Sequence, residues 1–372
     1  MARFRIPYLG DIWNEMSSTG RKTFPWDLVR SATDGCVEPI FRTFALVIAI
    51  QYFHCSVIEK SVIASAAPCG LLLSLVYASV STIWFRRRSV QVFFPYVGIV
   101  LGTFVAAFAP SGTWFALGIL IVGLSHPLRF PSLTAIYREN YRGTVRGQVL
   151  GLTVTTLVLL TLVVNYAGGE WIDIDIANYR HLFLLLGTIA AVGGFSVLKI
   201  PSRSVPHRRA DPPSAYIRVL TGHPIFAYVL LSWFIFGAAN LAMIPQTFEL
   251  LSQEKYGFNL SPGGVAIVLG VVPELTRLLF IQVWARIFDR FHILTVRIVI
   301  NAFWLAYMIL FFQSGSLWLV CVGVACRGIG FAGGAITWNL WVTRFATPEE
   351  TSKYMAIHTF MTGVRGVTAP YL

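Results

Sequence analysis

The sequence predicts an all-α polytopic membrane protein, a bundle with about 11 transmembrane spans. Hydrophobic residues make up 56% of the 372 residues and charged residues only 12%, whereas a water-facing surface needs about 25% charged residues. The apolar residues gather in continuous stretches of about 20, which is the length of a helix that crosses a bilayer. They do not alternate with polar residues, so an outer-membrane barrel is excluded. The composition also excludes a disordered chain and a soluble enzyme without membrane attachment.

The predicted spans follow a polar, basic N-terminal segment that lacks the apolar core of a secretory signal. Connections between the spans are short, so neighbouring helices should be antiparallel. The eleven spans are expected at about residues 31–53, 61–85, 90–109, 112–136, 146–167, 180–199, 223–247, 262–285, 293–312, 315–342 and 353–372.

The lysines and arginines predict the orientation of the chain. Of the 29 basic residues, 21 fall in the N-terminal segment and in loops on one side of the membrane, three fall on the other side, and five lie within spans. Cytoplasmic loops hold the excess of basic residues. We therefore expect a multi-pass protein of the cell (inner) membrane with a cytoplasmic N-terminus, acting as a monomer.

The net charge of +12 is spread in short clusters between apolar stretches. A nucleic-acid site would need a continuous basic surface, so we expect no nucleic-acid partner. The expected partners are the lipid bilayer and a small-molecule solute.

The chain divides into two halves. Residues 1–30 are interpreted as a cytoplasmic tail, residues 31–199 as an N-terminal half of six helices, and residues 200–222 as a cytoplasmic linker with four prolines. Residues 223–372 form a C-terminal half of five spans. Features repeat at an offset of about 205 residues, such as Pro68 and Pro273, which indicates a six-plus-six repeat. A complete repeat would need a twelfth span, so we expect the chain to be incomplete at its C-terminus.

The strongest local motif is Ala285-Arg286-Ile287-Phe288-Asp289-Arg290, after the eighth span. It resembles the G-x-L-x-D-R loop signature of the major facilitator superfamily, with Ala for the leading Gly and Ile for Leu. An aspartate at this helix end can accept hydrogen bonds from a neighbouring helix N-terminus and lock that face. The corresponding loop of the first half, Phe85-Arg86-Arg87-Arg88, lacks the aspartate, so a lock is not expected there.

The loop from Tyr137 to Gly147 after the fourth span also resembles this superfamily, because it places Arg142-Gly143 and Arg146-Gly147 at the turn into the fifth span. The resemblance covers almost the whole chain. It implies a bundle of six plus six helices in which spans one, four, seven and ten line a central cavity. It also implies transport by alternating access of the two halves.

Ionisable residues inside spans are costly and are therefore candidates for function. Glu274 and Arg277, three residues apart, are expected to act with Asp289 and Arg290 in gating. The other candidates are expected to bind the substrate. They are Asp34, Glu38, Arg42, His126, Arg129, Asn240, Arg327, Trp338 and Asn339.

The charges within the spans predict an organic anion as the solute. Pairing Glu38 with Arg42 and Glu274 with Arg277 leaves Arg129, Arg327 and Arg365 against Asp34, a positive excess. We expect Arg129 and Arg327 as principal contacts, because a guanidinium matches a carboxylate or phosphate. Trp338 and Asn339 would shape the pocket. An uncharged sugar is the alternative, since tryptophan and asparagine also suit hydroxyl-rich rings.

The sequence contains no H-E-x-x-H, P-loop or G-x-S-x-G motif, so we expect no cofactor, no metal and no catalytic residues. The alternative function is an integral membrane enzyme such as a lipid or glycan transferase, which is expected to expose catalytic side chains in a large loop. Asp34, Glu38, Glu274 and His126 could each carry a coupled proton, and the sequence selects none of them.

Overall fold

The computed structural model describes residues 9–205, 212–243 and 267–368, together with positions 246, 247, 250, 251, 258 and 260. Within these residues the regular structure is helical, apart from an isolated bridge between Arg87 and Ser204. The helices of the first half are α1 (Leu9–Glu15), α2 (Ser18–Pro39), α3 (Ala45–Gln51), α4 (Val57–Trp84), α5 (Arg88–Ala107), α6 (Gly112–Leu128), α7 (Phe130–Asn140), α8 (Arg146–Ile174) and α9 (Tyr179–Leu198). Those that follow are α10 (Pro213–Gly222), α11 (Pro224–Ala242), α14 (Val272–Arg290), α15 (Ile293–Gln313), α16 (Leu317–Leu340) and α17 (Thr351–Thr368).

Nine helices in the described part of the chain are long and apolar enough to cross a membrane. They correspond to the second through tenth predicted spans, with α6 and α7 together forming the fourth. At the first and eleventh predicted positions lie α2–α3 and α17; of these, α2 and α17 carry more polar residues and line a cavity between the halves. Residues 244–245 and 261–266, at the edges of two predicted spans, and residues 369–372 lie outside the described residues.

The first membrane helix differs from its predicted bounds. It starts at Ser18 and not near residue 31, because the side chain of Ser17 accepts a hydrogen bond from the backbone of Gly20 and caps the helix. It then continues through Pro39 into one π-helical turn, Ile40–Phe44, before α3. Proline cannot donate the regular backbone bond, and single π turns are frequent at functional sites.

Within the first half, helices approach closely where glycines face each other. A Cβ atom at Gly118 on α6 would lie 2.6 Å from the backbone nitrogen of Ala106 on α5, and one at Gly102 would lie 2.6 Å from the carbonyl oxygen of Gly118. Small residues let helices in a membrane pack backbone against backbone, where van der Waals contact drives association.

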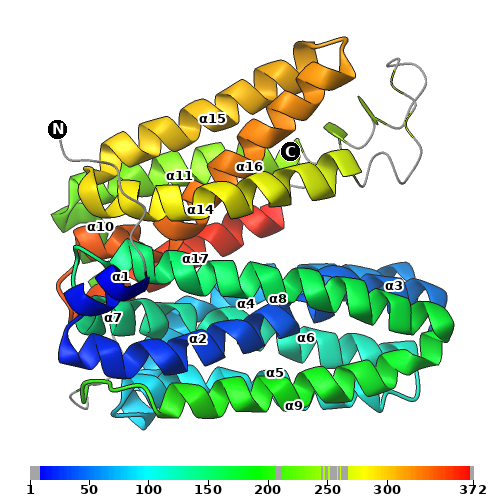
Figure 1. The fold of residues 1–372 in the computed structure, drawn as a ribbon. Helices are drawn as coiled ribbons and strands as arrows, with labels where there is room; N and C mark the ends of the chain where they lie inside the picture. Colours follow the sequence, from blue (N-terminus) through cyan, green and yellow to red (C-terminus); the bar gives the residue numbers. More distant parts are fainter. Residues whose placement is uncertain are drawn as a thin grey trace.

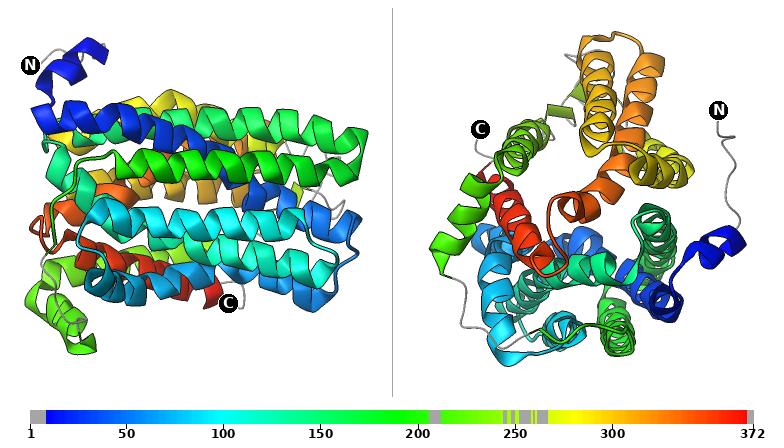
Figure 2. Two further views of the ribbon diagram at one scale, coloured as in Figure 1. Left: turned by 90° about the horizontal axis from the view of Figure 1, so that it is seen from below. Right: turned by 90° about the vertical axis from the view of Figure 1, so that its left-hand side faces the viewer.

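The helices form two bundles that lie side by side (Figure 1). Residues of α2 to α9 form one bundle, and α11 with α14, α15 and α16 forms the other (Figure 2). Helix α17 packs on α4 and α7 of the first half as well as on α11, and α14 packs on α8. We call the end that carries Arg86–Arg88, Arg138–Arg146 and Arg344 the basic end, and the other the opposite end.

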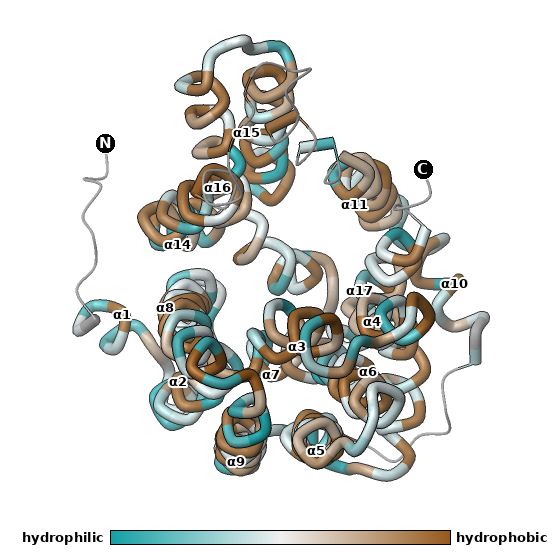
Figure 3. The backbone as a smooth tube through the Cα atoms, turned by 90° about the vertical axis from the view of Figure 1, so that its right-hand side faces the viewer, coloured by the Kyte–Doolittle hydropathy of each residue, from teal (hydrophilic) through white to brown (hydrophobic). Residues whose placement is uncertain are grey.

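Hydrogen bonds between the halves gather toward the basic end. Arg146 donates to Thr343, Arg88 donates to the carbonyl of Glu349, and Arg203 pairs with Glu349. In the view from the opposite end, α14 lies beside α8 and α11 lies beside α17 (Figure 3). The hydrogen bonds therefore join the halves at the basic end of the molecule.

The glycine contact between α5 and α6 makes a stability prediction. Gly118→Val is expected to lower the free energy of unfolding by about 1–3 kcal/mol, because the added atoms overlap the backbone of α5. Thermal unfolding of the purified protein in detergent checks this. Gly169→Val, at a position with open space around it, is the control, and equal melting temperatures for the two variants would contradict the prediction.

Candidate functional site

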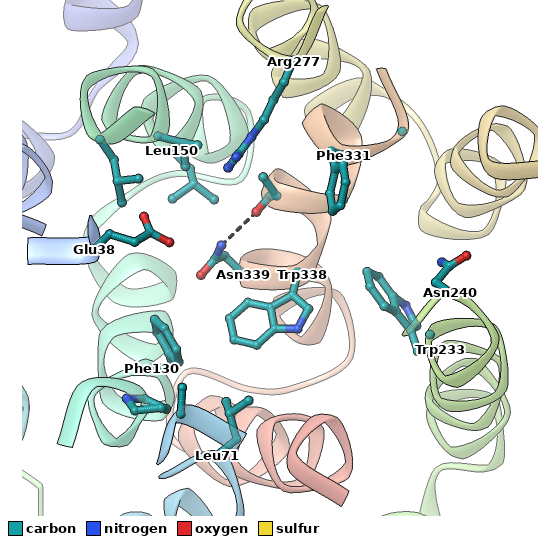
Figure 4. Close-up of a pocket in the computed structure, with 18 of the residues that line it drawn as sticks. Glu38, Leu71, Phe130, Leu150, Trp233, Asn240, Arg277, Phe331, Trp338 and Asn339 are labelled. Atoms are coloured by element: carbon teal, nitrogen blue, oxygen red, sulfur yellow. Dashed lines mark hydrogen bonds between the residues drawn. The ribbon is translucent and has the colours of Figure 1, made fainter. Parts of the chain in front are cut away.

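A cavity of about 530 Å³ lies between the two halves. Its walls come from α2, the π turn, α4 and α6 to α8 on one side, and from α11 and α14 to α17 on the other. Figure 4 shows Glu38, Phe130 and Leu71 facing Asn339, Trp338 and Trp233 across it. The structure brings all the predicted substrate-binding residues to this cavity: Asp34, Glu38, Arg42, His126, Arg129, Asn240, Arg327, Trp338 and Asn339.

On the wall of the first half, Asp34 is held by two arginines. One of its oxygens pairs with Arg30 and the other with Arg129, and Tyr96 donates to it at 2.6 Å. Arg129 also contacts the ring nitrogen of His126 at 2.6 Å. Arg129, expected as a principal contact of an anion, thus has its charge compensated by Asp34 in this structure.

Arg30 and Asp27 extend this network toward the basic end. Arg30 pairs with Asp27 at 2.8 Å and donates to the hydroxyl of Tyr137 at 2.8 Å, and Tyr141 donates to Asp27 at 3.2 Å. Two buried carboxylates therefore meet two buried guanidiniums, so this network is electrically neutral. Arg30 belongs to α2 and not to the predicted N-terminal tail. The spacing of Asp27, Arg30 and Asp34, which places them on one helix face, is the sequence signal for this network.

Two further pairs follow the spacing predicted from the sequence. Glu38 accepts from Arg42 at 2.8 Å, with the Arg42 side chain 66% exposed. Glu274 pairs with Arg277 at 3.3 Å on α14. Arg277 lines the cavity and Glu274 does not. Each pair compensates its own charge.

On the wall of the second half, three arginines lack such compensation. Among the residues that the structure describes, no carboxylate forms an ion pair with Arg297, Arg327 or Arg365, and all three line the cavity. Arg297 is one of the 21 basic residues that the orientation prediction assigned to the N-terminal segment and the loops of one side. The structure places it inside α15 and buried, so that count was wrong for this residue.

Aromatic rings and backbone carbonyls hold these arginines in place. The guanidinium of Arg297 lies 3.8 Å from the centre of the Trp233 ring, a cation–π contact. Arg365 donates to the carbonyl of Trp233 at 2.8 Å. It crosses α11 at Gly237, where any Cβ atom would overlap its guanidinium. The sequence held no signal for this role of Gly237, since the contact joins α17 to α11.

The remaining polar residues of this wall make few hydrogen bonds to other helices. Asn339 donates to the carbonyl of Ala335, one turn earlier on its own helix, at 2.8 Å. The side-chain oxygen of Asn240 has no hydrogen-bond partner among the described residues. Trp338 packs edge-to-face on Phe130 at 5.1 Å, across the two halves.

His358 is a buried residue that the sequence analysis missed. It is 1% exposed, and neither ring nitrogen has a hydrogen-bond partner among the described residues. Its ring lies 5.5 Å from Trp233, 5.2 Å from Trp338 and 5.3 Å from Trp341. A single histidine inside the polar helix at 353–372 was the available signal.

Asp289 lies outside the cavity and joins the two halves. Its carboxylate accepts from the backbone of Gly147 at 2.7 Å and of Gln148 at 3.0 Å, which belong to the first turn of α8. The residue before that helix, Val145, supplies no side-chain cap. Asp289 of one half therefore caps a helix of the other half. Its neighbour Arg290 is exposed at the surface.

A family model of the major facilitator superfamily matches residues 39–370. The chain belongs to the major facilitator superfamily. None of the curated protein sequences matches it.

Solved structures of superfamily transporters share the fold at low sequence identity. FucP in the outward conformation has a TM-score of 0.71 at 15% identity, covering 93% of this chain and 90% of that chain. The human organic anion transporter MFSD10 (TETRAN) has a TM-score of 0.70 at 14% identity, and the match covers 95% of this chain and 93% of that chain. The proton:xylose symporter XylE has a TM-score of 0.62 at 12% identity, and the match covers 98% of this chain and 88% of that chain.

Membership of the superfamily fits the arrangement of the cavity. The helices at the first, fourth, seventh and tenth span positions each contribute lining residues, and α14, α15 and α17 add more. The all-α, multi-pass architecture predicted from the sequence is confirmed, and it is the fold of a membrane transporter.

The cap by Asp289 predicts a shift between conformations of this superfamily member. Asp289→Ala removes the acceptor of two backbone N–H groups and is expected to favour separation of the halves at the basic end by about 1 kcal/mol, or about fivefold. The labelling rate of a single cysteine at Ala335, with a membrane-impermeant reagent added on each side in turn, reports this shift. Asp173→Ala, an exposed position at the opposite end, is the control. Unchanged labelling would contradict the role of Asp289.

The network around Asp34 predicts a double-mutant result. Arg129→Gln or Asp34→Asn alone leaves a buried charge under-compensated and is expected to cost about 3 kcal/mol of stability. The double variant removes both charges and should be more stable than the sum of the single effects by at least about 1 kcal/mol. Thermal unfolding of the four proteins measures this coupling. Additive effects would show that the pair is not coupled.

Proposed function

We propose that this chain is a secondary active transporter that carries a small organic anion by alternating access. The observation that carries the proposal is that Arg297, Arg327 and Arg365, on one wall of the cavity between the halves, have no carboxylate partner among the described residues. The proposal keeps the anion expected from the sequence and changes its principal contacts from Arg129 and Arg327 to these three arginines.

The charges of the described lining residues support an anion over a neutral or cationic solute. Asp34 with Arg129, Glu38 with Arg42, and Glu274 with Arg277 cancel within pairs. Arg30 is matched by Asp27. Among the described lining residues this leaves an excess of three positive charges, of which Arg297 is buried and Arg327 and Arg365 are half-buried. Removing a charge from water costs several kcal/mol unless a partner compensates it, so the empty cavity should favour a negatively charged ligand.

The guanidinium groups also suit the chemistry of an organic acid. Arginine presents a planar fork of donors that matches a carboxylate or a phosphate with two hydrogen bonds. The Nε and one terminal nitrogen of Arg297, and the Nε of Arg365, have no hydrogen-bond partner among the described residues. Around them the cavity is lined by aromatic rings, which suit an apolar body. A volume of about 530 Å³ lies within the usual range for a small-molecule site.

The solved structures with this fold are transporters, and their solutes belong to different chemical classes. One printed title names an organic anion transporter, and others name fucose and xylose symporters. The shared fold cannot choose between these classes. The charge of the cavity wall favours the anion.

The contacts between the halves indicate how access would alternate. The cap by Asp289 and the bonds of Arg88 and Arg146 hold the basic end together, so the solute would enter from the opposite end. We place the basic end and the N-terminus in the cytoplasm of a cell whose inner membrane holds the protein as a monomer. Release would then require these contacts to break while contacts form at the opposite end.

Substitution of the cavity arginines tests the proposal. Arg297→Gln and Arg365→Gln are each expected to weaken binding of a transported anion by about tenfold to a hundredfold, because each removes a charge-assisted hydrogen bond. Uptake into proteoliposomes and its concentration dependence measure this effect, with a panel of carboxylates, phosphates and neutral sugars as solutes.

Arg180→Gln is the matched control, because Arg180 contacts the carbonyl of Ala109 outside the cavity. It should transport as the wild type does. Uptake of a neutral sugar with unchanged affinity in both cavity variants would contradict the proposal, as would chemical turnover of a substrate without net flux.

A further inference from the structure

A row of aromatic rings links two of the uncompensated arginines along one wall of the cavity. The rings of Phe236 and Trp304 are 6.4 Å apart, and those of Trp304 and Phe331 are 4.9 Å apart. All three residues line the cavity. The row joins α11, α15 and α16, so only the tertiary structure assembles it.

One end of the row is a corner built around Trp233. Arg297 lies 5.6 Å from the Phe236 ring and 3.8 Å from the Trp233 ring, and Arg365 donates to the Trp233 carbonyl. Arg297 is only 7% exposed, and two of its nitrogens lack hydrogen-bond partners among the described residues. Two neighbouring guanidiniums with free donors, and with no carboxylate partner in the part of the chain that the structure describes, make a site for one strongly acidic group.

The other end of the row is Arg327. Its guanidinium lies 5.2 Å from the Phe331 ring and 5.6 Å from the Tyr307 ring. No ion pair forms at this arginine among the residues that the structure describes. It therefore offers a second positive site at the end of the same aromatic row.

The backbone of α15 places the two ends at different heights along the cavity wall. Arg297 and Tyr307 lie on the same helix, α15, ten residues apart. At 1.5 Å per residue their positions differ by about 15 Å along the helix. A single carboxylate or phosphate that binds the Trp233 corner would leave Arg327 uncompensated.

We propose that the solute is an elongated dianion, with one acidic group at the Trp233 corner, a second at Arg327, and an apolar middle that packs on Phe236, Trp304 and Phe331. This inference rests on the proposed transport of an organic anion and specifies its chemical class. Each acidic group compensates a buried positive site, and the apolar middle gains from burial against the rings.

Decanedioate and its monomethyl ester are the probes, because they have the same chain and differ in one charge. Both are added to the purified full chain in detergent, and the rise of the melting temperature with concentration gives the affinity. Decanedioate is expected to bind at least about tenfold more tightly than the ester, since one charge-assisted contact contributes about that factor. Butanedioate, too short to reach both ends, should bind no better than the ester.

Two variants test which arginine binds each acidic group of the probe. Arg327→Gln should abolish the preference for decanedioate over its ester, because the second acidic group of decanedioate loses its charged partner. Arg297→Gln should weaken both probes, because both place an acidic group in the Trp233 corner. Arg180→Gln, outside the cavity, should behave as the wild type.

The outcomes separate this inference from the proposed function. Equal binding of decanedioate and its ester, with no effect of Arg327→Gln, would overturn the dianion while binding of an anion at Arg297 stands. Failure of every probe to bind the wild type, or equal binding in Arg297→Gln, would overturn both.

Discussion

A charge that leaves water for the interior of a membrane bundle costs several kcal/mol unless another charge compensates it. The two walls of the cavity meet this constraint in different ways. In the first half, Asp34 lies between Arg30 and Arg129, and Asp27 completes a neutral network. In the second half, three arginines have no carboxylate partner among the described residues. The charges of the first wall compensate one another, whereas under the proposal above an anionic solute would compensate those of the second wall.

The difference in charge between the two walls gives the two halves different roles in binding a solute. The neutral network joins α2 to α5 and α7 through Tyr96 and Tyr137, and its charges are balanced without a solute. The arginines of the other wall lie on α15, α16 and α17 and contact rings and a carbonyl. An anion that binds them would therefore act mainly on the second half, and could bias how that half sits against the first.

Asp289 joins the two halves by capping the N-terminus of α8. The first turn of any helix has backbone N–H groups without intrahelical partners. In α8 they are satisfied by a carboxylate from the other half, and Gly147 allows the close approach because a Cβ there would lie 2.5 Å from the carbonyl oxygen of Ala285. Separation of the halves at the basic end would leave that helix terminus without this acceptor, which is a reason for the closed arrangement to be stable.

The sequence by itself determined the fold class and the approximate positions of the nine most apolar spans, because a bilayer imposes length and apolarity on each helix. It also determined the local pairs, Glu38 with Arg42 and Glu274 with Arg277, since three and four residues bring side chains together on one helix. Only the tertiary structure decided the partners between helices. Arg129 meets Asp34 across 95 positions of the chain, and Arg365 meets Trp233 through the space left by Gly237. Such contacts depend on how helices pack, and no periodicity within a single helix encodes them.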